Sequence, residues 1–535
     1  MVYPLFLVLL YLFVVILGSP DAPFPQGDEI MHIRTIRESL ETGNYLIPSL
    51  SGLPNPYKPP LLFWLGMASD RIFGIGYFQE RFVSLFFGLG SLLLLFGITL
   101  QIQKERKEVF LTTLFFGFSF LSLKFFSLLM MEGPMVFFLL FYFYLFFHHK
   151  RTKDRKLLLW GSVLVGVGYL LKGPILQVYL FLFVFSHLYI RMVRIRKGKI
   201  SILWNRIPEE KYLLYSLALT LLLPIGWILY LYISLPSGKD LLRFFFITEN
   251  IGKFYAANQP GLRIWFGWIL YSIPFTIPFL QLFWNQLRNP RRSKYQSYVM
   301  TILVFLLLVT TLHLLPNRKD PYYVTPFISL LFLLPSFKKF TWESLLTTKT
   351  NQFALIIAYF FLIMVSIVVR LPNLFLVSLL GLLLLGSSVC FFETKKNQWL
   401  AVLFTQIAII PIVIFFLLRP MADPDLRSLT KEAENASICV IAENPWTAMD
   451  VQNKLMEASV QFALPLTIQE NCSKSEYLIN FTDAKITNEF TKLKSWFQWK
   501  QHLQMEAKSV FSSILKMEKQ KFQTEISLWK REATP

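Results

Sequence analysis

The stretch FVSLFFGLGSLLLLFGITL at residues 82–100 contains no charged side chain and decides the class of this protein. About 20 consecutive apolar residues in a helix span the roughly 30 Å hydrocarbon core of a bilayer. Charge-poor runs of about 15 to 22 residues recur along the chain as far as residue 418. The pattern predicts a mainly α-helical protein that crosses a membrane many times.

The composition excludes several other classes of protein. The 535 residues are 54% hydrophobic and only 16% charged, and the mean hydropathy is +0.49. Soluble, disordered, coiled-coil and collagen-like chains do not combine so many apolar residues with so few charges. An outer-membrane barrel is excluded as well, because its strands are segments of only about 10 residues with alternating polarity.

The apolar runs, delimited by their charged or turn-forming flanks, predict about thirteen transmembrane helices. They lie near residues 3–18, 82–100, 109–123, 126–147, 157–171, 174–190, 212–234, 264–284, 297–315, 321–336, 352–369, 372–392 and 398–418. Small residues follow the first run, as in a signal peptide, but no basic region precedes it. We therefore expect residues 3–18 to be an uncleaved span.

The distribution of positive charge predicts the orientation of the chain, which carries a net charge of +20. Clusters of Lys and Arg occupy alternate connections, within residues 104–107, 150–156, 191–199, 288–294, 338–339 and 395–396. Because such connections face the cytoplasm, we expect the N-terminus inside, and residues 19–81 and 419–535 outside, the cytoplasmic membrane. The same distribution explains most of the charge without binding to nucleic acid.

Two long loops, residues 19–81 and 235–263, are expected on the outer side, where long loops tend to carry function. The first contains the amphipathic stretch Glu29–Leu40, in which isoleucines recur at helical spacing beside charged residues. This pattern suits a helix that lies on the membrane surface. A second helix is expected after Pro59 and Pro60.

The composition changes at residue 419, so we divide the chain into a membrane domain, 1–418, and an extracytoplasmic α/β domain, 419–535. Residues 437–442, 477–481 and 525–529 resemble strands, whereas 447–460 and 484–520 resemble helices. The three cysteines show no zinc or redox spacing. Cys439 and Cys472 both fall in this second domain, and whether they form a disulfide is left open by the sequence.

Ionisable groups gather at the outer ends of the predicted spans, where they are costly unless they are used. The carboxylates are Asp28, Glu29, Glu132 and Glu249, and the cations and the phenol are Lys58, Arg81, Lys172, Lys253, Arg318, Lys319 and Tyr323. Several cations with few carboxylates suit a phosphate-bearing substrate and one general base. Taken singly, Lys58 and Lys172 are equally explained as snorkelling residues, and Glu132 as a buried structural partner.

The segments around these residues resemble a known family. They are Gly27-Asp28-Glu29, RESLETGNYLIP at 37–48, YKPPLLFW at 57–64, Arg81, LKGP at 171–174, ENIGKF at 249–254 and KDPYYVTP at 319–326. Their order and spacing resemble bacterial ArnT-like (aminoarabinose transferase) and PMT-like (protein mannosyltransferase, glycosyltransferase family 39) membrane glycosyltransferases. The resemblance covers most of the first 340 residues.

The resemblance implies a GT-C fold and a glycosyltransferase that moves a sugar, with inversion, from a polyprenyl-phosphate donor to a lipid, glycan or protein acceptor on the outer face. Asp28 matches the catalytic acid of the family, with Glu29 and Glu132 as further catalytic candidates. A carboxylate there deprotonates the acceptor hydroxyl, while cations stabilise the charge that develops on the departing lipid phosphate. The candidates for that phosphate are Lys58, Arg81, Lys172, Lys253, Lys319 and Tyr323.

The sequence departs from the aminoarabinose transferases at the positions that resemble a metal site. An acid and a histidine there are replaced by Tyr57 and Asn250. We therefore predict no cofactor and no metal site, because Tyr and Asn are poor ligands for a transition metal, while the sequence leaves a divalent metal open as the alternative. An Arg and a Tyr of those enzymes are replaced by Met31 and His32, and a lone histidine on an amphipathic helix is more often structural than functional.

Two other classes of function account for part of the sequence. A transporter or flippase for a lipid-linked sugar also has many spans and outer cations, but paired repeats and broken helices, which are typical of transporters, are not apparent here. A membrane scaffold with an extracytoplasmic binding domain is compatible with residues 419–535. It leaves Asp28, Glu29 and the Lys58-Pro59 pair without a role.

Overall fold

The structure is a computed structural model, which describes the chain with gaps. The described residues are 27–50, 52–55, 57–196, 199–202, 208–288, 296–337, 341–390, 395–418, 438–441, 475–480, 489–499 and 523–532, together with 9, 11, 12, 449, 453, 512 and 516. The predicted first span, 3–18, lies almost wholly outside them.

Six helices in the described part of the chain are long and apolar enough to cross a membrane. They are Tyr77–Ile102 (α4), Ile175–Met192 (α10), Lys211–Ser234 (α11, Lys211–Leu219, with α12, Leu222–Ser234), Gln296–Leu314 (α16), Lys349–Val369 (α19) and Gln398–Leu417, within α21 (Lys395–Ile412) and η7 (Val413–Leu418). A bent pair raises the number to seven. The chain is therefore an integral membrane protein, while the count of about thirteen spans stays a prediction.

Several predicted spans are helices that do not meet the same criteria of length and composition. They are α5 (Arg106–Gly117), α6 (Phe120–Phe125), α7 (Glu132–Thr152), α8 (Arg155–Gly166), α9 (Tyr169–Lys172), α17 (Thr325–Leu333) and α20 (Pro372–Cys390). Short elements join them: α13 (Gly238–Arg243), α18 (Trp342–Leu346), η2 (Pro208–Glu210), η3 (Phe244–Asn250), η4 (Ile251–Phe254), η5 (Pro321–Val324) and η6 (Leu334–Phe337). Two hairpins pair β1 (Ser49–Leu50) with β2 (Leu53–Pro54) and β3 (Val193–Arg196) with β4 (Lys199–Ile202).

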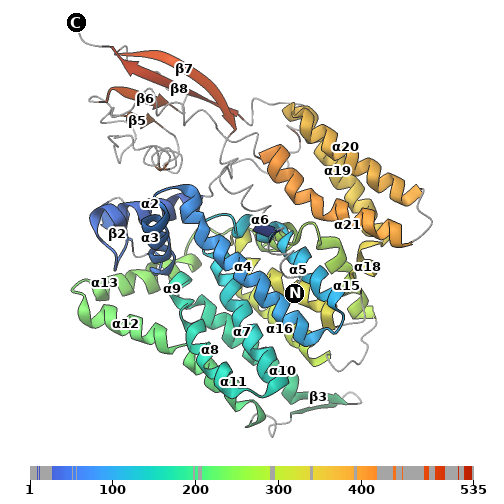
Figure 1. The fold of residues 1–535 in the computed structure, drawn as a ribbon. Coiled ribbons are helices and arrows are strands. Elements are labelled where there is room, and N and C mark those ends of the chain that lie inside the picture. Colours follow the sequence, from blue (N-terminus) through green and yellow to red (C-terminus); the bar gives the residue numbers. More distant parts are fainter. Residues whose placement is uncertain are drawn as a thin grey trace.

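Aromatic side chains fill the centre of the helical bundle, where α4 packs along α7 (Figure 1). Phe143 of α7, Phe183 of α10 and Phe305 of α16 meet there with ring centroids 4.1 to 6.2 Å apart. Small residues make the close packing possible. A Cβ at Gly88 of α4 would lie only 2.5 Å from the Phe126 ring, so this position has no room for a side chain.

The first outer loop folds as the sequence predicts, into α2 (Gly27–Thr42) and α3 (Leu61–Phe73), the second of which follows Pro59 and Pro60. The isoleucine stripe of α2 is fully buried. The polar side of the helix is largely buried against protein as well, and the position of α2 on the membrane surface stays a prediction. Arg37 donates from Nε and Nη2 to Glu80 of α4 at 2.7 and 3.1 Å, which anchors the polar side of α2 to the bundle.

The predicted span 264–284 is broken, which contradicts the expectation of unbroken helices. Helix α14 (Leu262–Ser272) meets α15 (Thr276–Arg288) at an angle of 108° across Pro274, a residue that cannot continue a helix. An apolar cavity of about 470 Å³ lies beside the break, between these helices, α16 and α17. No charged side chain is among the residues that line this cavity, so it lacks the ionisable groups of a transport site.

The described part of residues 419–535 forms a sheet with the strand order β5-β6-β8-β7. Strands β5 (Ile438–Ile441) and β6 (Tyr477–Asn480) are parallel, and β8 (Gln523–Arg531) runs antiparallel to both β6 and β7 (Phe490–Trp499). The three expected strands are confirmed. The helix expected over 484–520 is wrong at 490–499, because β7 pairs with β8 along its whole length and this pairing overrides the amphipathic pattern.

The sheet lies at the same end of the molecule as α2 and α3, which we call the α2 end, whereas β3 lies at the opposite end (Figure 1). Asn453 links the tail to α2, because its side chain donates to the carbonyl of Ile30 at 3.1 Å and its own carbonyl accepts from Arg37. Cys439 is disulfide-bonded, and Cys472 lies outside the described residues.

Candidate functional site

The first turn of α2 carries Asp28 and Glu29, where the positive end of the helix dipole favours carboxylates. Glu29 is fully buried and accepts two hydrogen bonds from the guanidinium of Arg81, at 2.8 and 2.9 Å. It also accepts from the backbone N–H of Leu129 at 2.7 Å. Glu29, predicted as a catalytic residue, and Arg81, predicted as a phosphate ligand, therefore form an ion pair with each other. The contacts of Glu29 connect α2 to α4 and to the turn before α7.

Asp28 is partly exposed, and its partner comes from a segment 294 residues further along the chain. The Tyr322 hydroxyl donates to Asp28 Oδ2 at 3.2 Å, and it lies 3.3 Å from Asp320 Oδ2. Arg318 Nε donates to the same Asp320 oxygen at 2.9 Å. The turn at 318–322 thus brings a second carboxylate, a phenol and a guanidinium next to the predicted base.

Lys172 and Glu132, which the sequence assigned to different roles, form one ion pair of 2.6 Å between their Nζ and Oε1 atoms. Glu132 is buried at the start of α7, and Lys172 ends α9. The Lys172 ammonium lies 5.4 Å from the ring centroids of Tyr322 and Tyr323, within the range of a cation–π interaction. These contacts place Lys172 and Glu132 beside the Asp28 cluster.

Lys58 and Lys253 share a single counter-ion, Glu249. Glu249 Oε1 is 2.5 Å from Lys58 Nζ and 3.5 Å from Lys253 Nζ. Although burial disfavours its charge, the two ammonium groups hold the pKa of Glu249 below its ordinary value. Burial, and then the neighbouring Lys58 ammonium, lower the pKa of Lys253 to about 8. The three side chains keep one net positive charge.

Lys319 is buried in the connection between two loops. Its Nζ donates to Asn258 Oδ1 at 2.9 Å, and its backbone N–H donates to Gln259 Oε1 at 2.7 Å. The neighbouring Asn317 carbonyl accepts from the Gln259 N–H at 2.9 Å. Lys319 therefore joins the turn at 316–320 to the loop after η4, and its hydrogen bonds within the described part of the chain go to neutral oxygens.

Tyr323 and His32 complete the predicted residues. The Tyr323 ring lies 5.3 Å from His313, which accepts or donates a 2.8 Å hydrogen bond with Tyr179. His32 is buried, and its Nδ1 lies 3.0 Å from the carbonyl of Leu129. Burial lowers the pKa of His32 and keeps the ring neutral, although the Asp28 carboxylate opposes this shift. The contact with Leu129 joins His32 of α2 to the segment before α7, and its structural role stays a prediction.

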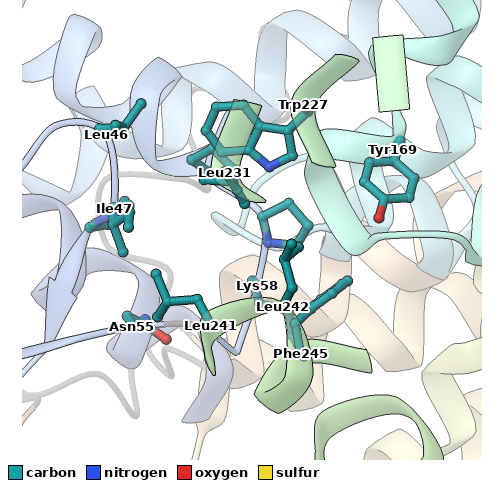
Figure 2. Close-up of a pocket in the computed structure, with 13 residues that line it drawn as sticks. Leu46, Ile47, Asn55, Lys58, Tyr169, Trp227, Leu231, Leu241, Leu242 and Phe245 are labelled. Carbon is teal, nitrogen blue, oxygen red and sulfur yellow. The ribbon is translucent and has the colours of Figure 1, made fainter. Parts of the chain in front are cut away.

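A cavity of about 50 Å³ opens beside Lys58 and is shown in Figure 2. Its walls come from the first outer loop, α9, α12, α13 and η3. The lining side chains are mainly apolar, and Lys58 is the charged group among them: Leu46, Ile47, Pro48, Asn55, Lys58, Pro59, Pro60, Tyr169, Trp227, Leu231, Leu241, Leu242 and Phe245. A small apolar cavity therefore has one ammonium group in its wall.

Tyr57 and Asn250, which stand at the positions of the expected metal ligands, make other contacts. Asn250 Nδ2 donates to the carbonyl of Phe245 at 2.7 Å, and the Tyr57 ring packs edge-on against Phe244 at 5.1 Å. Among the residues that the structure describes, no group of three or more His, Cys, Asp or Glu side chains is placed to hold a metal ion. The side chains present at these two positions do not fit the expected metal site.

The structure thus brings most of the predicted residues together at the α2 end. Several of them form ion pairs with one another that the sequence did not predict. Sequence reasoning missed Asp320 and Tyr322, although both lie inside the segment KDPYYVTP that drew attention to Lys319 and Tyr323. The available signal was an acid directly after a lysine in a turn between two apolar runs. Its pairing with α2, nearly 300 residues away, depends on the tertiary fold.

Comparison with known families finds proteins that are similar to this chain. Residues 32–241 match the model of the family described as dolichyl-phosphate-mannose-protein mannosyltransferase, abbreviated PMT. An uncharacterized protein of Aquifex aeolicus is 28% identical over 305 residues, which are 56% of this chain and 66% of the relative. The undecaprenyl phosphate-alpha-4-amino-4-deoxy-L-arabinose arabinosyl transferase 2 of Pseudomonas fluorescens is 24% identical over 305 residues, 56% of this chain and 49% of the relative. The match thus spans about half to two thirds of these relatives.

The fold is similar to a solved structure along nearly its whole length. ArnT from Cupriavidus metallidurans, bound to undecaprenyl phosphate, superposes with a TM-score of 0.67 over 98% of this chain and 97% of that chain. The sequence identity is 12%, so the comparison concerns the fold. The same protein in the apo state gives a TM-score of 0.64.

Proposed function

We propose, on the premise that this chain belongs to the ArnT-like and PMT-like membrane glycosyltransferases of the GT-C fold, that it transfers a sugar from a polyprenyl phosphate to an acceptor hydroxyl or phosphate. The acceptor is a lipid, glycan or protein on the outer face of the cytoplasmic membrane. Undecaprenyl phosphate is named for a relative and for a solved structure of this fold. The reaction inverts the anomeric centre, and Asp28 is the base.

The observation that supports this proposal best is the unequal pairing of charges around Glu249. Two lysines, Lys58 and Lys253, share one carboxylate, so the cluster attracts a further anion. Lys58 also reaches the apolar cavity of Figure 2. A phosphate attached to a long apolar chain matches this combination of an ammonium pair and an apolar cavity.

The cavity next to Lys58 is too small for a complete donor. Its volume of about 50 Å³ is far below the roughly 300–1,000 Å³ of ordinary ligand pockets. We therefore propose that donor binding opens the contact between the first outer loop and α13. The phosphate displaces Glu249 from Lys58, and the first isoprenoid units enter between α12 and η3.

The chemistry requires one proton transfer and one exchange of bonds. The Asp28 carboxylate accepts the proton of the acceptor hydroxyl, whose oxygen attacks the anomeric carbon as the bond to the phosphate oxygen breaks. Polyprenyl phosphate departs with the electron pair of that bond. Lys58, Lys253 and Lys172 stabilise the charge that develops on it, and preorganised cations of this kind lower the barrier most in a site with little water.

The roles of the remaining predicted residues follow from their contacts. Glu29 and Arg81 position α2, Glu132 positions Lys172, and Lys319 joins two loops. Tyr323 stays a candidate phosphate ligand because its ring lies beside Lys172. We propose a metal-independent reaction, since Tyr57 and Asn250 are directed into other contacts, and we expect unchanged turnover after exhaustive chelation.

The first test replaces Asp28 with Asn, which keeps the shape and removes the charge. Purified protein is incubated with a panel of undecaprenyl-phosphate sugars, and sugar release to water is measured because this needs no knowledge of the acceptor. We expect Asp28→Asn to lower turnover about 10²–10⁴-fold, the usual contribution of a general base. Binding of undecaprenyl phosphate should stay unchanged.

The control variant is Asp240→Asn, which removes an exposed carboxylate from α13 at the same end of the molecule. It should have the turnover of the unmodified protein. Turnover of Asp28→Asn within about tenfold of the unmodified protein would contradict the assignment and transfer the role of base to Glu132, the next buried carboxylate of the cluster.

A further inference from the structure

The Tyr322 hydroxyl lies between two carboxylates that belong to distant parts of the chain. It is 3.2 Å from Asp28 Oδ2 and 3.3 Å from Asp320 Oδ2. Hydrogen bonds between oxygens usually measure about 2.7–2.8 Å, so both contacts are long and nearly equal. A phenol has a single proton and donates to one acceptor at a time. The geometry is that of one proton shared between two alternative acceptors.

The position of the phenol is fixed by its surroundings. Asp320 is held by Arg318, which donates to Oδ2 at 2.9 Å, and the backbone N–H of Tyr323 donates to the Asp320 carbonyl at 3.1 Å. The Tyr322 ring lies 5.4 Å from the Lys172 ammonium, which is itself paired with Glu132. The hydroxyl proton can therefore turn from one carboxylate to the other while the ring stays in place.

We propose that Tyr322 is a positioning residue for Asp28 and that Asp320 is the alternative acceptor of its hydroxyl proton, a role that rests on the transfer reaction proposed above. While the phenol donates to Asp28 Oδ2, it fixes the plane of the carboxylate and leaves Oδ1 to the acceptor hydroxyl. When the phenol turns to Asp320, the Asp28 carboxylate loses this donor and accepts the proton of the acceptor hydroxyl in its place.

The proton balance of this step is simple. The acceptor O–H bond breaks and the Asp28 O–H bond forms, whereas Tyr322 keeps its own proton and only changes the oxygen to which it donates. Arg318 neutralises Asp320 throughout, so that no unpaired carboxylate arises next to the base. After the transfer, protonated Asp28 is the donor nearest to Tyr322, and the phenol stays directed to Asp320.

The test measures turnover against pH for Tyr322→Phe, with an undecaprenyl-phosphate sugar that the unmodified protein hydrolyses. We expect kcat to fall about tenfold to a hundredfold, the effect of a misplaced reacting group, with KM for the donor unchanged. We also expect the acid limb of the profile to move to higher pH, because a carboxylate that loses a donor holds its proton more tightly. In Asp320→Asn the phenol stays on Asp28, and the limb should move to lower pH.

The matched control is Tyr142→Phe, which removes another buried hydroxyl, 2.9 Å from Ser216, in the helical bundle. This variant should keep the pH profile of the unmodified protein. An acid limb that is the same in Tyr322→Phe and Tyr142→Phe would overturn the proposal, since a purely structural hydroxyl changes stability and leaves the titration of the base in place.

A second measurement separates this inference from the proposed function. The infrared carboxyl band that disappears in Asp28→Asn is titrated without donor, in the unmodified protein and in Tyr322→Phe. A band that titrates at higher pH in Tyr322→Phe supports the coupling even where no donor is hydrolysed, a case in which only the transfer reaction would be refuted. Identical titrations in the two proteins would overturn the coupling, whatever the activity.

Discussion

At the scale of single residues, the site is organised by which charge each side chain neutralises. Glu29 and Arg81 form a closed pair, and so do Glu132 and Lys172. Removal of one partner of such a buried pair strongly destabilises a protein, because the other charge stays buried without compensation. Lys253 differs because it shares its carboxylate with Lys58, so these two ammonium groups together keep an excess positive charge.

The shared carboxylate predicts a pH dependence of anion binding. Burial and the Lys58 ammonium lower the pKa of Lys253 to about 8, so Lys253 is charged below pH 8 and neutral above it. Above that pH an anion must bind together with a proton, so the affinity for undecaprenyl phosphate should fall by up to about tenfold for each pH unit. The measurement is equilibrium binding of undecaprenyl phosphate to the purified protein between pH 6.5 and 9.5.

The matched variant is Lys253→Arg, whose guanidinium stays protonated over this whole range. Its affinity should be nearly constant between pH 8 and 9.5. A decline with pH that is identical in the variant and in the unmodified protein would assign the titration to another group.

At the scale of elements, the turn that carries Tyr322 packs against α14 at a glycine, Gly267, which has no side chain. Gly267 of α14 faces η5 so closely that a Cβ there would lie 2.1 Å from the Pro321 carbonyl oxygen. The break between α14 and α15 sets the direction of this helix. A backbone contact between α14 and η5 therefore fixes where Tyr322 meets Asp28.

The close contact predicts that Gly267→Ala displaces the turn. The added methyl group collides with backbone, which cannot move aside as a flexible side chain does, and overpacking of this kind costs about 1–3 kcal/mol. We expect a lower melting temperature and a lower rate of sugar release. Thermal unfolding in detergent and the hydrolysis assay measure the two effects.

Gly226→Ala is the control for this prediction. Gly226 lies within the helix α12, and a Cβ there would meet nothing within 4 Å. Since alanine favours a helix over glycine by about 0.5–1 kcal/mol, this variant should be as stable as the unmodified protein or more so. Equal stability of the Gly267 and Gly226 variants would show that the turn adapts without cost.

At the scale of the whole molecule, the candidate site and the tail sheet lie at one end, and the basic β3–β4 hairpin lies at the other (Figure 1). From the positive-inside rule we expect that hairpin in the cytoplasm and the α2 end outside it. Asn453 joins the tail to α2, the helix that carries Asp28. The tail therefore contacts the helix that carries the predicted base.

This orientation predicts which positions an impermeant thiol reagent reaches in intact cells. Cysteines introduced at Asn44, in the first outer loop, and at Leu493, on β7, should be labelled, because both side chains are exposed at the α2 end. A cysteine at Lys153, between α7 and α8, should be labelled only after the cells are opened. Labelling of position 153 in intact cells would reverse the assignment of sides.

The sequence by itself determined the class of the protein, the helices α2 and α3 and most of the cations at the site. These features can be recognised from short segments of sequence. A long apolar run has few stable alternatives to a membrane helix, and isolated charges at its ends are easily identified. The same local reasoning failed at 490–499, where an amphipathic pattern forms a strand because β8 is there to pair with it.

Only the tertiary structure decided how the charges are paired. Glu29 meets Arg81 across 52 positions, Lys58 meets Glu249 across 191, and Asp28 meets Tyr322 across 294. A sequence lists acids and bases without their partners, whereas the packing of helices selects each partner and decides whether a charge is neutralised. The predicted base was therefore visible in the sequence, but Tyr322 and Asp320, which surround it, became recognisable only once the chain had folded.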